Sequence, residues 1–438
     1  FGRAAGSARR DGSKPAGGAR QLVLAAWLRR LETQHPRAMD LGLARLEVVW
    51  RALGAPRPAP KVVTVAGTNG KGSAVATLRA LAQAEGLRVG DTTSPHLHRF
   101  NERIVVDGTP ASDEQIVEAF ERIETARGAT SLTYFETAIL AALLILREAE
   151  LDLAILEVGL GGRLDAVNII DADVALITPV DLDHQAWLGN TREAIGREKA
   201  GIFRAGRPVV IADPCPPASV LAQAVALRCP RACLGEDFSL QVGSQGARVR
   251  VEGFGAKLDA PLAAPLPVAE PSFLGALQAF AALGYALEGR HLAAALAMAP
   301  PPGRQSWTQL GSQALLFDVA HNPHAAAFLA SRLEAPVATA VFGCFEDKDA
   351  EAMFDALAPK VGQWAFVDTD GPRGQSAQVL ADRLRGRLEA RGATFQCLGA
   401  LGPEALTWLR AAGGARIAVL GSFTVVAAAQ RLLGLDPR

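Results

Sequence analysis

The 438-residue chain lacks a long apolar run: although 49% of its residues are hydrophobic, no window approaches the roughly 18 uninterrupted apolar residues typical of a membrane span. It also lacks an excess of charge of either sign, because 45 lysines and arginines balance 45 aspartates and glutamates. This balance argues against nucleic acid or an anionic membrane as the main partner, but it allows a local basic site for a small anion. The length exceeds that of a usual single domain, so we expect two domains.

Cysteine is scarce, and the five cysteines (Cys215, Cys229, Cys233, Cys344 and Cys397) are scattered along the chain. An odd, scattered set is typical of reduced thiols in a cytoplasmic protein rather than of a disulfide framework. Cys229 and Cys233 lie close together in sequence, but no histidine is near them and their spacing fits no common zinc pattern. We therefore expect a cytoplasmic protein in which this pair has no metal role.

The first twenty residues have no apolar segment of the kind that a secretion signal requires. They are rich in glycine, alanine and arginine, with five basic residues and one acidic residue. Such an arginine-rich, acid-poor segment could be a transit peptide. We expect instead that residues 1–20 are a disordered lead-in and that the folded protein starts near Gln21.

Apolar runs of strand length alternate with segments of helical length. The runs that suit buried parallel strands are residues 61–67, 151–159, 171–180 and 207–213, and those of helical length are residues 71–86 and 134–150. This alternation predicts an α/β fold in which residues 21–298 form a P-loop domain with a doubly wound, mostly parallel sheet. Residues 247–253 also read as β structure, at an edge.

A cluster of prolines and glycine near residue 300 breaks this pattern and predicts a linker over residues 299–305. Beyond it the alternation resumes, with apolar strands expected at residues 314–322, 337–344, 363–370 and 415–423. We therefore expect residues 306–438 to form a second, smaller Rossmann-like α/β domain.

The stretch VTVAGTNGKGS joins a predicted strand to a predicted helix through a turn with three glycines. Gly67 closes the strand, and Gly70 and Gly72 let the backbone approach an anion without a Cβ atom in the way. Lys71 can reach a terminal phosphate, and the Ser73 hydroxyl is placed to ligate Mg²⁺. A glycine separates Lys71 from Ser73, unlike in the standard P-loop, yet the flanking strand and helix favour nucleotide binding. We predict that ATP contacts Gly67, Thr68, Asn69, Gly70, Lys71, Gly72 and Ser73.

A metal ion at this turn needs ligands from the ends of neighbouring strands. Glu157 ends the run LDLAILE, and His184 follows the run that ends in PVDLD. Because the carboxyl ends of parallel strands line the ligand crevice, we expect both side chains to lie near Ser73. A carboxylate and a neutral imidazole can complete a Mg²⁺ shell, although imidazole is an uncommon Mg²⁺ ligand. Lys199 follows in a helix-like segment, where the residues alone indicate only a solvated lysine.

A second polar cluster follows an apolar strand in the second half of the chain. The stretch FDVAHNPHA puts Asp318 and His321 at the strand end, before a turn into a helix. Such a cluster indicates ligand contact rather than packing, and the absence of a G-x-S-x-G elbow argues against a serine nucleophile. Arg304, in the linker, is placed to contact phosphate between the two domains.

Together these segments resemble the folylpolyglutamate synthase and dihydrofolate synthase family of the Mur ligase superfamily. The resemblance runs from Gln21 onward and looks most like the bifunctional bacterial enzymes. It is carried, in the family's order, by VAGTNGKGS, TSPHLHRFNERI, TYFETA, LEVGLGGRLDAVNI, DLDHQAWLG, REKAGIFR, DVAHNPHA, DKD, GPRG and GSF. It implies a central-type ATP-binding domain over residues 21–298 and a C-terminal glutamate ligase domain over residues 306–438.

The activity that the resemblance implies is ATP-dependent ligation of L-glutamate through an acyl phosphate. Dihydropteroate plus glutamate would give dihydrofolate, and reduced folates plus glutamate would give folylpolyglutamates. ATP and Mg²⁺, at two sites, would be required. The implied partners are these small molecules only, without nucleic acid or membrane, and the protein would act as a monomer.

The resemblance also implies roles for single residues. Lys199 matches a lysine that relatives carry as a carbamate, whose negative charge helps to hold a second Mg²⁺. The implied metal ligands are Ser73, Glu157, His184 and Lys199, and the further ATP contacts are Arg304 and Asp318. The implied catalytic residues are Lys71, Lys199, His184, Asp318 and His321. The implied substrate contacts, in the mobile loop of residues 94–103 and at the pterin, are Ser94, Pro95, His96, Arg99, Phe100, Asp165 and Ala166.

Two positions depart from the family pattern. Ser272 stands where relatives usually have an asparagine that contacts the nucleotide, and Thr424 stands where a histidine is common after GSF. These changes could alter glutamate handling or leave a folate-binding protein without catalysis. Two further functions stay open. One is a different Mur-type amide ligase, but the SPHL and YFE segments argue against it. The second is a P-loop nucleotide switch or nucleic-acid-dependent motor, and the neutral charge balance argues against that.

Overall fold

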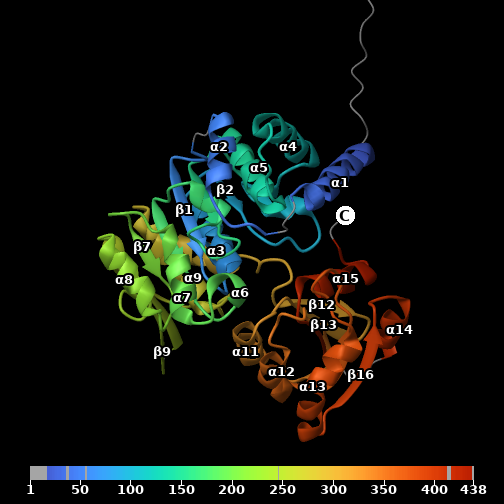
Figure 1. Ribbon diagram of the computed structural model, residues 1–438. Coiled ribbons are helices and arrows are strands. Elements are labelled where there is room, and N and C mark those ends of the chain that lie inside the picture. Colours follow the sequence, from blue (N-terminus) through green and yellow to red (C-terminus); the bar gives the residue numbers. More distant parts are fainter. Residues whose placement is uncertain (1–16, 36–38, 55–56, 245, 412–415, 437–438) are drawn as a thin grey trace, which may run out of the picture.

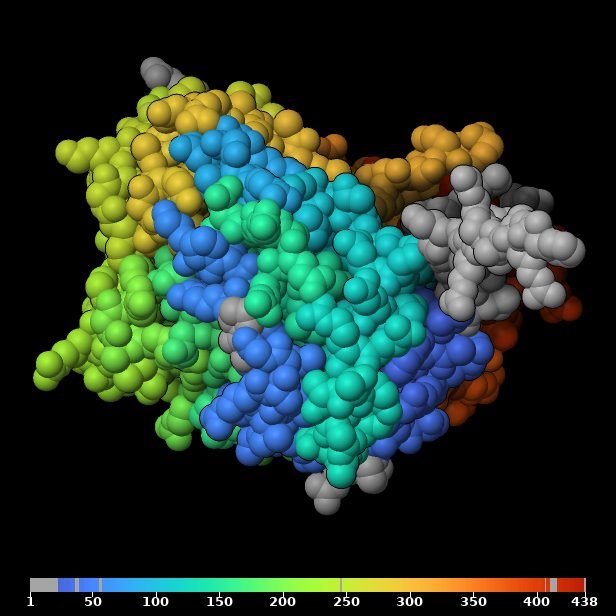
Figure 2. All heavy atoms as spheres, turned by 90° about the horizontal axis from the view of Figure 1, so that it is seen from above, coloured from blue at the N-terminus to red at the C-terminus, as the bar shows by residue number. Residues whose placement is uncertain are grey.

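The computed structural model describes residues 17–35, 39–54, 57–244, 246–411 and 416–436, which form two α/β parts (Figure 1). From above, atoms of the first part cover most of the visible face, and orange and red atoms of the second part emerge at one side (Figure 2). Among the described residues, no helix is both long and apolar enough to cross a bilayer.

An eight-stranded sheet forms the centre of the first part, in the order β4-β3-β2-β5-β1-β6-β7-β8. The six strands from β2 to β8 in this order are parallel, whereas β3 and β4 are antiparallel additions at one edge. The strands are β1 Lys61–Ala66, β2 Val89–Thr92, β3 Ile104–Val106, β4 Thr109–Pro110, β5 Leu153–Glu157, β6 Val174–Ile177, β7 Val209–Ile211 and β8 Arg231–Cys233. This sheet confirms the predicted doubly wound, mostly parallel fold.

Helices cover both faces of this sheet because its central strands are apolar on both sides. In β1, Val62 packs into the core on one face and Val63 into the core on the other, as the two-residue period of a strand requires. The helices on the first face are α1 Gly17–Gln34, α2 Ala44–Ala52, α4 Asp113–Arg127, α5 Tyr134–Glu148, α7 Arg192–Lys199 and α8 Ala218–Ala226. Those on the second face are α3 Lys71–Ala84, α9 Glu270–Ala282 and α10 Gly289–Ala297. A short helix, α6 Gln185–Leu188, follows β6.

A six-stranded sheet forms the second part, in the order β12-β13-β17-β14-β15-β16, with only the edge strand β12 antiparallel to its neighbour. The strands are β12 Ser306–Leu310, β13 Gln313–Asp318, β14 Val337–Phe342, β15 Val361–Val367, β16 Thr394–Gly399 and β17 Arg416–Leu420. The helices are α11 Pro323–Arg332, α12 Ala350–Leu357 and α13 Ala377–Arg391 on one face, with α14 Pro403–Ala411 and α15 Phe423–Leu432 on the other. The predicted second α/β unit is therefore present.

Two details differ from the sequence-based expectation. Helix α1 begins at Gly17, so the expected start of the folded chain at Gln21 lies inside this helix, and residues 1–16 lie outside the described residues. The β structure expected at an edge near residue 250 is the central strand, β10 Gly246–Val251, of a separate antiparallel sheet with β9 Phe238–Gly243 and β11 Leu258–Pro261. Its apolar side chains Val249 and Val251 pack against the core on the α9 side of the large sheet, which the sequence pattern alone did not reveal.

The two large sheets place their carboxyl ends toward a common space. The loops after β1, β2, β5 and β6 supply the walls of the first part, and those after β13, β14, β15 and β17 supply the walls of the second. Because ligands of open α/β sheets bind at the carboxyl ends of the strands, this shared space is where a site is expected.

Candidate active site

The glycine-rich turn after β1 requires glycine at its two corners. Gly67 has a φ of 154°, and Gly70, which precedes the first residue of α3, lies in the left-handed region with a φ of 86°. A Cβ atom on Gly70 would lie 2.1 Å from the Ser272 Oγ atom, and one on Gly67 would lie 1.8 Å from the Thr178 Oγ1 atom. The turn is therefore held between helix α9 and the end of β6, at the positive end of α3, which is the arrangement that binds phosphate.

Two lysines converge on this turn. The Lys71 Nζ atom donates to the Gly67 and Thr68 carbonyl oxygens, both at 3.2 Å, and the Lys199 Nζ atom donates to the Gly67 carbonyl oxygen at 2.8 Å. Burial lowers the pKa of both amines, and burial together with the neighbouring Lys71 charge lowers the pKa of Lys199 to about 7. Among the described residues, no ion pair includes either lysine. Two amines that face one turn without a carboxylate partner make a site for an anion.

The residues predicted to ligate a metal gather around the same turn. Glu157, at the end of β5, is buried, and its carboxylate accepts a hydrogen bond from the Ser94 backbone N–H at 3.2 Å. A Cβ atom on Gly72 would lie 3.7 Å from the Glu157 Oε2 atom, so this carboxylate faces the first turn of α3, which carries the buried Ser73. Burial raises the pKa of Glu157, and a nearby cation would relieve this cost.

His184 immediately precedes the short helix α6, with a left-handed φ of 51°. Its side chain lines the same space as Glu157 and Lys199. Burial lowers the pKa of its imidazole to about 4, so the ring is neutral at pH 7, which is the form that binds metal ions. Ser73, Glu157 and His184 therefore fit a divalent cation by their chemistry and by the loops that carry them.

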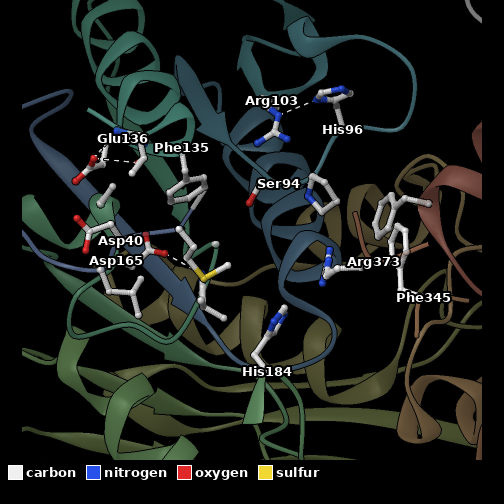
Figure 3. A pocket seen from close by; sticks show the side chains of 18 of the residues that line it. Asp40, Ser94, His96, Arg103, Phe135, Glu136, Asp165, His184, Phe345 and Arg373 are labelled. Carbon is white, nitrogen blue, oxygen red and sulfur yellow. Dashed lines mark hydrogen bonds between the residues drawn. The ribbon is translucent and has the colours of Figure 1, made fainter. Parts of the chain in front are cut away.

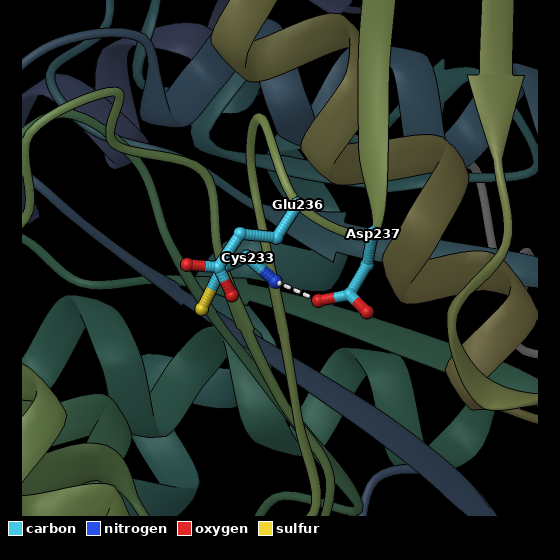
Figure 4. A group of neighbouring side chains, drawn as sticks. All are labelled: Cys233, Glu236 and Asp237. Carbon is cyan, nitrogen blue, oxygen red and sulfur yellow. Dashed lines mark hydrogen bonds between the residues drawn. The ribbon is translucent and has the colours of Figure 1, made fainter.

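A different group of side chains has metal-like spacing but a structural explanation. Candidate ligand atoms of Cys233, Glu236 and Asp237 lie within 4.8 Å of one another (Figure 4). The Asp237 carboxylate, however, accepts a hydrogen bond from the Cys233 backbone N–H at 2.7 Å and so closes the turn between β8 and β9. Burial also raises the pKa of the Cys233 thiol, which favours the protonated form that does not ligate metals.

A cavity of about 480 Å³ lies between the two parts of the protein. Asp40, Glu136 and Asp165 lie on one side of it, and Phe345 and Arg373 lie on the opposite side, in the second part (Figure 3). Arg45 pairs with Asp40 and Glu136, and Asp347 pairs with Arg373, so Asp165 is the carboxylate of this wall for which the described structure gives no ion pair. A ligand with hydrogen-bond donors at one end and carboxylates at the other would complement it.

Most of the predicted substrate contacts line this cavity. They are Ser94, Pro95, His96, Asp165 and Ala166. The predicted catalytic residues His184 and His321 also line the cavity. The Asp165 carboxylate is fixed because it accepts hydrogen bonds from the backbone N–H groups of Leu160 at 2.8 Å and Val167 at 3.0 Å, and burial raises its pKa to about 6.

Two predicted substrate contacts lie elsewhere. Arg99 forms an ion pair with Asp113 at 3.0 Å, and Phe100 is buried in the core of the first part, where its ring contacts those of Phe120 and Tyr134. Neither lines the cavity. Arg103, which the sequence did not single out, lines the cavity. It ends the single helical turn from Phe100 to Arg103, in which Phe100 is buried.

A second cavity of about 280 Å³ extends from the glycine-rich turn to the linker. Its walls include Asn69, Gly70, Ser73, Ser272, Arg304 and Asp318. The Asp318 carboxylate accepts hydrogen bonds from the backbone N–H groups of Gln305 at 3.0 Å and Ala320 at 2.8 Å, and burial raises its pKa. The Ser272 hydroxyl is buried and has no hydrogen-bond partner in the described structure. Of the predicted ATP contacts, Asn69, Gly70, Ser73, Arg304 and Asp318 line this cavity, whereas Gly67, Thr68 and Lys71 line the adjoining space around Glu157.

Direct polar contacts join the two parts across the site. The Lys348 Nζ atom lies 2.6 Å from the Asp183 Oδ1 atom, and both side chains are largely buried. The Asn322 amide donates to the Asn69 Oδ1 atom at 2.8 Å. Burial tends to raise the pKa of Asp183. His184 and Lys348 outweigh burial and hold this pKa below its usual range, so the carboxylate stays ionised. The Asp183–Lys348 pair therefore joins the segment of the predicted ligand His184 to the second part.

His321 also belongs to this junction. Its Nδ1 atom lies 2.9 Å from the Val319 carbonyl oxygen, to which it donates, and its Nε2 atom lies 3.8 Å from Asp183. Burial lowers the pKa of His321 to about 4. A neutral ring whose Nδ1 carries the proton leaves Nε2 as a proton acceptor at the cavity wall.

Several wall residues were not predicted individually. They are Asp40, Arg103, Phe135, Glu136, Asp183, Phe345, Lys348 and Arg373. Motifs of the resemblance contain six of them, so the sequence carried a signal for Arg103, Phe135, Glu136, Asp183, Lys348 and Arg373. It did not show which members of these motifs face the cavity.

Comparison with known proteins gives a consistent result. Residues 303–423 match the family model described as Mur ligase, glutamate ligase domain. The chain is 40% identical to the dihydrofolate synthase/folylpolyglutamate synthase of Escherichia coli (strain K12), over 92% of this chain and 94% of that protein.

Two solved structures are similar over nearly the whole chain. E. coli FolC in complex with DHPP and ADP is 38% identical, with a TM-score of 0.86 over 94% of this chain and 97% of that one. The bifunctional folylpolyglutamate synthase/dihydrofolate synthase from Yersinia pestis CO92, complexed with AMPPNP and a Mn ion, is also 38% identical, with a TM-score of 0.85 over 94% and 98% of the two chains.

The role of His184 as a metal ligand can be tested by substitution. We expect His184→Ala to weaken Mn²⁺ binding in the presence of ADP by about 10-fold or more, because a neutral imidazole is removed from the shell. Electron paramagnetic resonance titration of free Mn²⁺ measures this affinity. The exposed Trp187 lies in the short helix α6 that follows His184 and lines none of the cavities described above, so Trp187→Ala is the matched control. Equal Mn²⁺ affinity for His184→Ala and wild type would contradict the assignment.

Proposed function

Because the chain belongs to the dihydrofolate synthase/folylpolyglutamate synthase family of the Mur ligase superfamily, we propose that it adds L-glutamate to dihydropteroate and to reduced folates with cleavage of ATP. It is an ATP-dependent ligase. The observation that carries the substrate assignment is the position of the two-lysine glycine turn beside a cavity with the fixed carboxylate of Asp165 on one side and Arg373 on the other. Phosphate activation and amide formation can therefore take place in one shared space.

The nucleotide is proposed to lie in the 280 Å³ cavity, with its triphosphate on the turn from Gly67 to Ser73. Lys71 would then lie against the transferring phosphate. Ser73, Glu157 and His184 would hold Mg²⁺, which neutralises charge on the phosphates when it is bound. Arg304, which lines the nucleotide cavity and the space around Lys71, would contact the phosphates from the linker side.

Lys199 is proposed to carry a carbamate that holds a second Mg²⁺. Burial brings its pKa to about 7, so a substantial fraction of the amine is neutral at physiological pH. A neutral amine adds to CO₂ to form N–COO⁻ with release of one proton. The product replaces one of two neighbouring positive charges by a negative one, which suits a buried site beside Lys71.

The acid substrate is proposed to bind with its pterin at the Asp165 side of the 480 Å³ cavity. The fixed carboxylate of Asp165 can accept hydrogen bonds from ring N–H and amino groups, and Phe135 supplies a flat apolar wall. Arg373, on the opposite side, can pair with a carboxylate of glutamate. This order places the carboxylate to be activated between the two ends, near Lys71.

The reaction then needs no protein nucleophile. The carboxylate of the pterin substrate attacks the γ-phosphate of ATP, which forms an acyl phosphate and releases ADP. The glutamate amine attacks the acyl carbon, and inorganic phosphate leaves. Lys71 offsets charge on the transferring phosphoryl group, and the neutral Nε2 atom of His321 can accept a hydrogen bond from the glutamate amine. Positioning across the two parts supplies most of the remaining rate.

The finer organisation remains part of the proposal. We place the ATP-binding domain at residues 21–298, the linker at 299–305 and the glutamate ligase domain at 306–438, which is supported by the gap between the end of α10 and the start of β12. A monomer in the cytoplasm is supported by the scattered free cysteines and by the convergence of all the proposed site residues within one chain.

The proposed activity predicts sustained ADP release only when ATP, glutamate and a pterin acid are all present. A coupled ADP-release assay that compares dihydropteroate with tetrahydrofolate measures both reactions. We expect Lys71→Ala to lower turnover about 100-fold or more, because it removes the cation at the transferring phosphate. Gln83→Ala, at an exposed position of the same helix, should leave turnover unchanged.

Two outcomes would contradict this proposal. Lys71→Ala enzyme with wild-type turnover and a normal circular dichroism spectrum would remove the phosphate role. ADP release that responds to DNA or RNA but not to pterin acid and glutamate would favour a nucleic-acid-dependent motor.

The carbamate on Lys199 predicts a dependence on dissolved CO₂. As pH falls through about 7 the amine becomes protonated, so enzyme depleted of CO₂ at pH 6 should lose activity and recover it when bicarbonate is added at pH 8. A carbamate signal in the ¹³C NMR spectrum with ¹³CO₂ should appear in wild type and be absent in Lys199→Arg. Full activity of the CO₂-depleted enzyme, together with no ¹³C carbamate signal, would refute this role.

A further inference from the structure

The loop of residues 94–103 touches the proposed metal site and the cavity at once. Its Ser94 backbone N–H donates to the Glu157 carboxylate at 3.2 Å. Its His96 and Arg103 side chains both line the 480 Å³ cavity and are joined by a hydrogen bond of 2.8 Å. A shift of this loop would therefore disturb the acid-substrate side of the site.

A single carboxylate closes the loop by hydrogen bonds to its backbone. Glu102 accepts hydrogen bonds from three successive backbone N–H groups, those of Leu97 at 2.7 Å, His98 at 2.8 Å and Arg99 at 2.7 Å. Charge-assisted bonds of this kind are stronger than neutral ones. Movement at Leu97 or His98 is thus transmitted to the cavity end of the loop.

The tip of the loop is anchored in the second part of the protein. The Leu97 side chain is buried in the core that contains Phe317 and Val319 of the second sheet. The His98 Nε2 atom lies 2.7 Å from the Oε1 atom of Gln430 in α15, and this is the one side-chain hydrogen bond that the described structure gives the ring.

The helix that receives His98 also reaches the cavity at its other end. Helix α15 begins at Phe423, whose side chain lines the cavity together with the preceding Ser422. One helix of the second part therefore contacts both the tip of the loop and the wall at which glutamate is proposed to bind.

From this geometry we infer that His98 and Gln430 are positioning residues: their hydrogen bond fixes the 94–103 loop to α15 and so sets the acid-substrate side of the cavity when the two parts lie together. The inference rests on the proposed function for its kinetic consequence. Its expected effect falls mainly on the acid substrate, because the loop reaches the phosphate side only through Ser94 and Pro95 and no residue of the loop lines the 280 Å³ cavity.

The kinetic test compares His98→Ala, Gln430→Leu and the double variant with wild type. We expect each single variant to raise the KM for dihydropteroate about 5- to 10-fold while the KM for ATP changes less than 2-fold, and the double variant to be no worse than the singles. Gln430→Glu keeps an acceptor for the ring and should stay near wild type. Arg431→Ala, at the next and exposed position of α15, is the matched control.

A second measurement keeps the inference testable even without turnover. Hydrogen–deuterium exchange in peptides that cover residues 94–99 should be faster in Gln430→Leu than in wild type, although the substitution lies in the other part of the chain. Unchanged exchange there would overturn the inference whether or not the enzyme is active. Equal rises in both KM values with a lowered Tm would also overturn it, since they indicate a purely structural role. Absence of wild-type turnover would instead overturn the proposed function.

Discussion

The site depends on one constraint: the carbonyl of Gly67 accepts hydrogen bonds from both Lys71 and Lys199, and neither amine has a carboxylate partner among the described residues. Two amines at a dehydrated turn are costly for a folded protein unless an anion, or a chemical change at one of them, offsets their charge. The lowered pKa of each amine is the sign of this cost. Phosphate on the turn and a carbamate on Lys199 are the two ways in which the protein is proposed to relieve it.

The second constraint is that neither part encloses the site alone. Asp183 and Asn69 of the first part bind Lys348 and Asn322 of the second, and these contacts surround the same space that the turn faces. The Asp165 wall of the large cavity belongs to the first part, whereas Arg373 and Phe345 belong to the second. Residues of both parts therefore enclose the space in which the ligation is proposed to take place, and an enclosed space would protect an activated acyl group from water.

The sequence predicted what strand periodicity and strand ends determine. Apolar runs located both sheets, and Glu157 and His184 lie at or beyond the carboxyl ends of strands of one parallel sheet, so their convergence was foreseeable. Which side chains of a loop face the cavity could not be foreseen, because the turn at residues 100–103 buries Phe100 while Arg103 lines the cavity. Contacts between the two parts, such as Asp183–Lys348, depend on their relative placement, which no local pattern encodes. The separate sheet around β10 was missed because its packing against the core on the α9 side joins segments that are far apart in the sequence.

The central claim is that the turn from Gly67 to Ser73 holds the triphosphate while the metal lies between that turn and Glu157. A crystal structure of this protein with Mn²⁺ and a non-hydrolysable ATP analogue tests it most directly, because anomalous scattering locates the metal independently of the nucleotide. The account predicts the γ-phosphate within hydrogen-bond distance of the Lys71 Nζ atom and a manganese peak shared by Ser73, Glu157 and His184. A triphosphate seated elsewhere, with this turn empty, would contradict it.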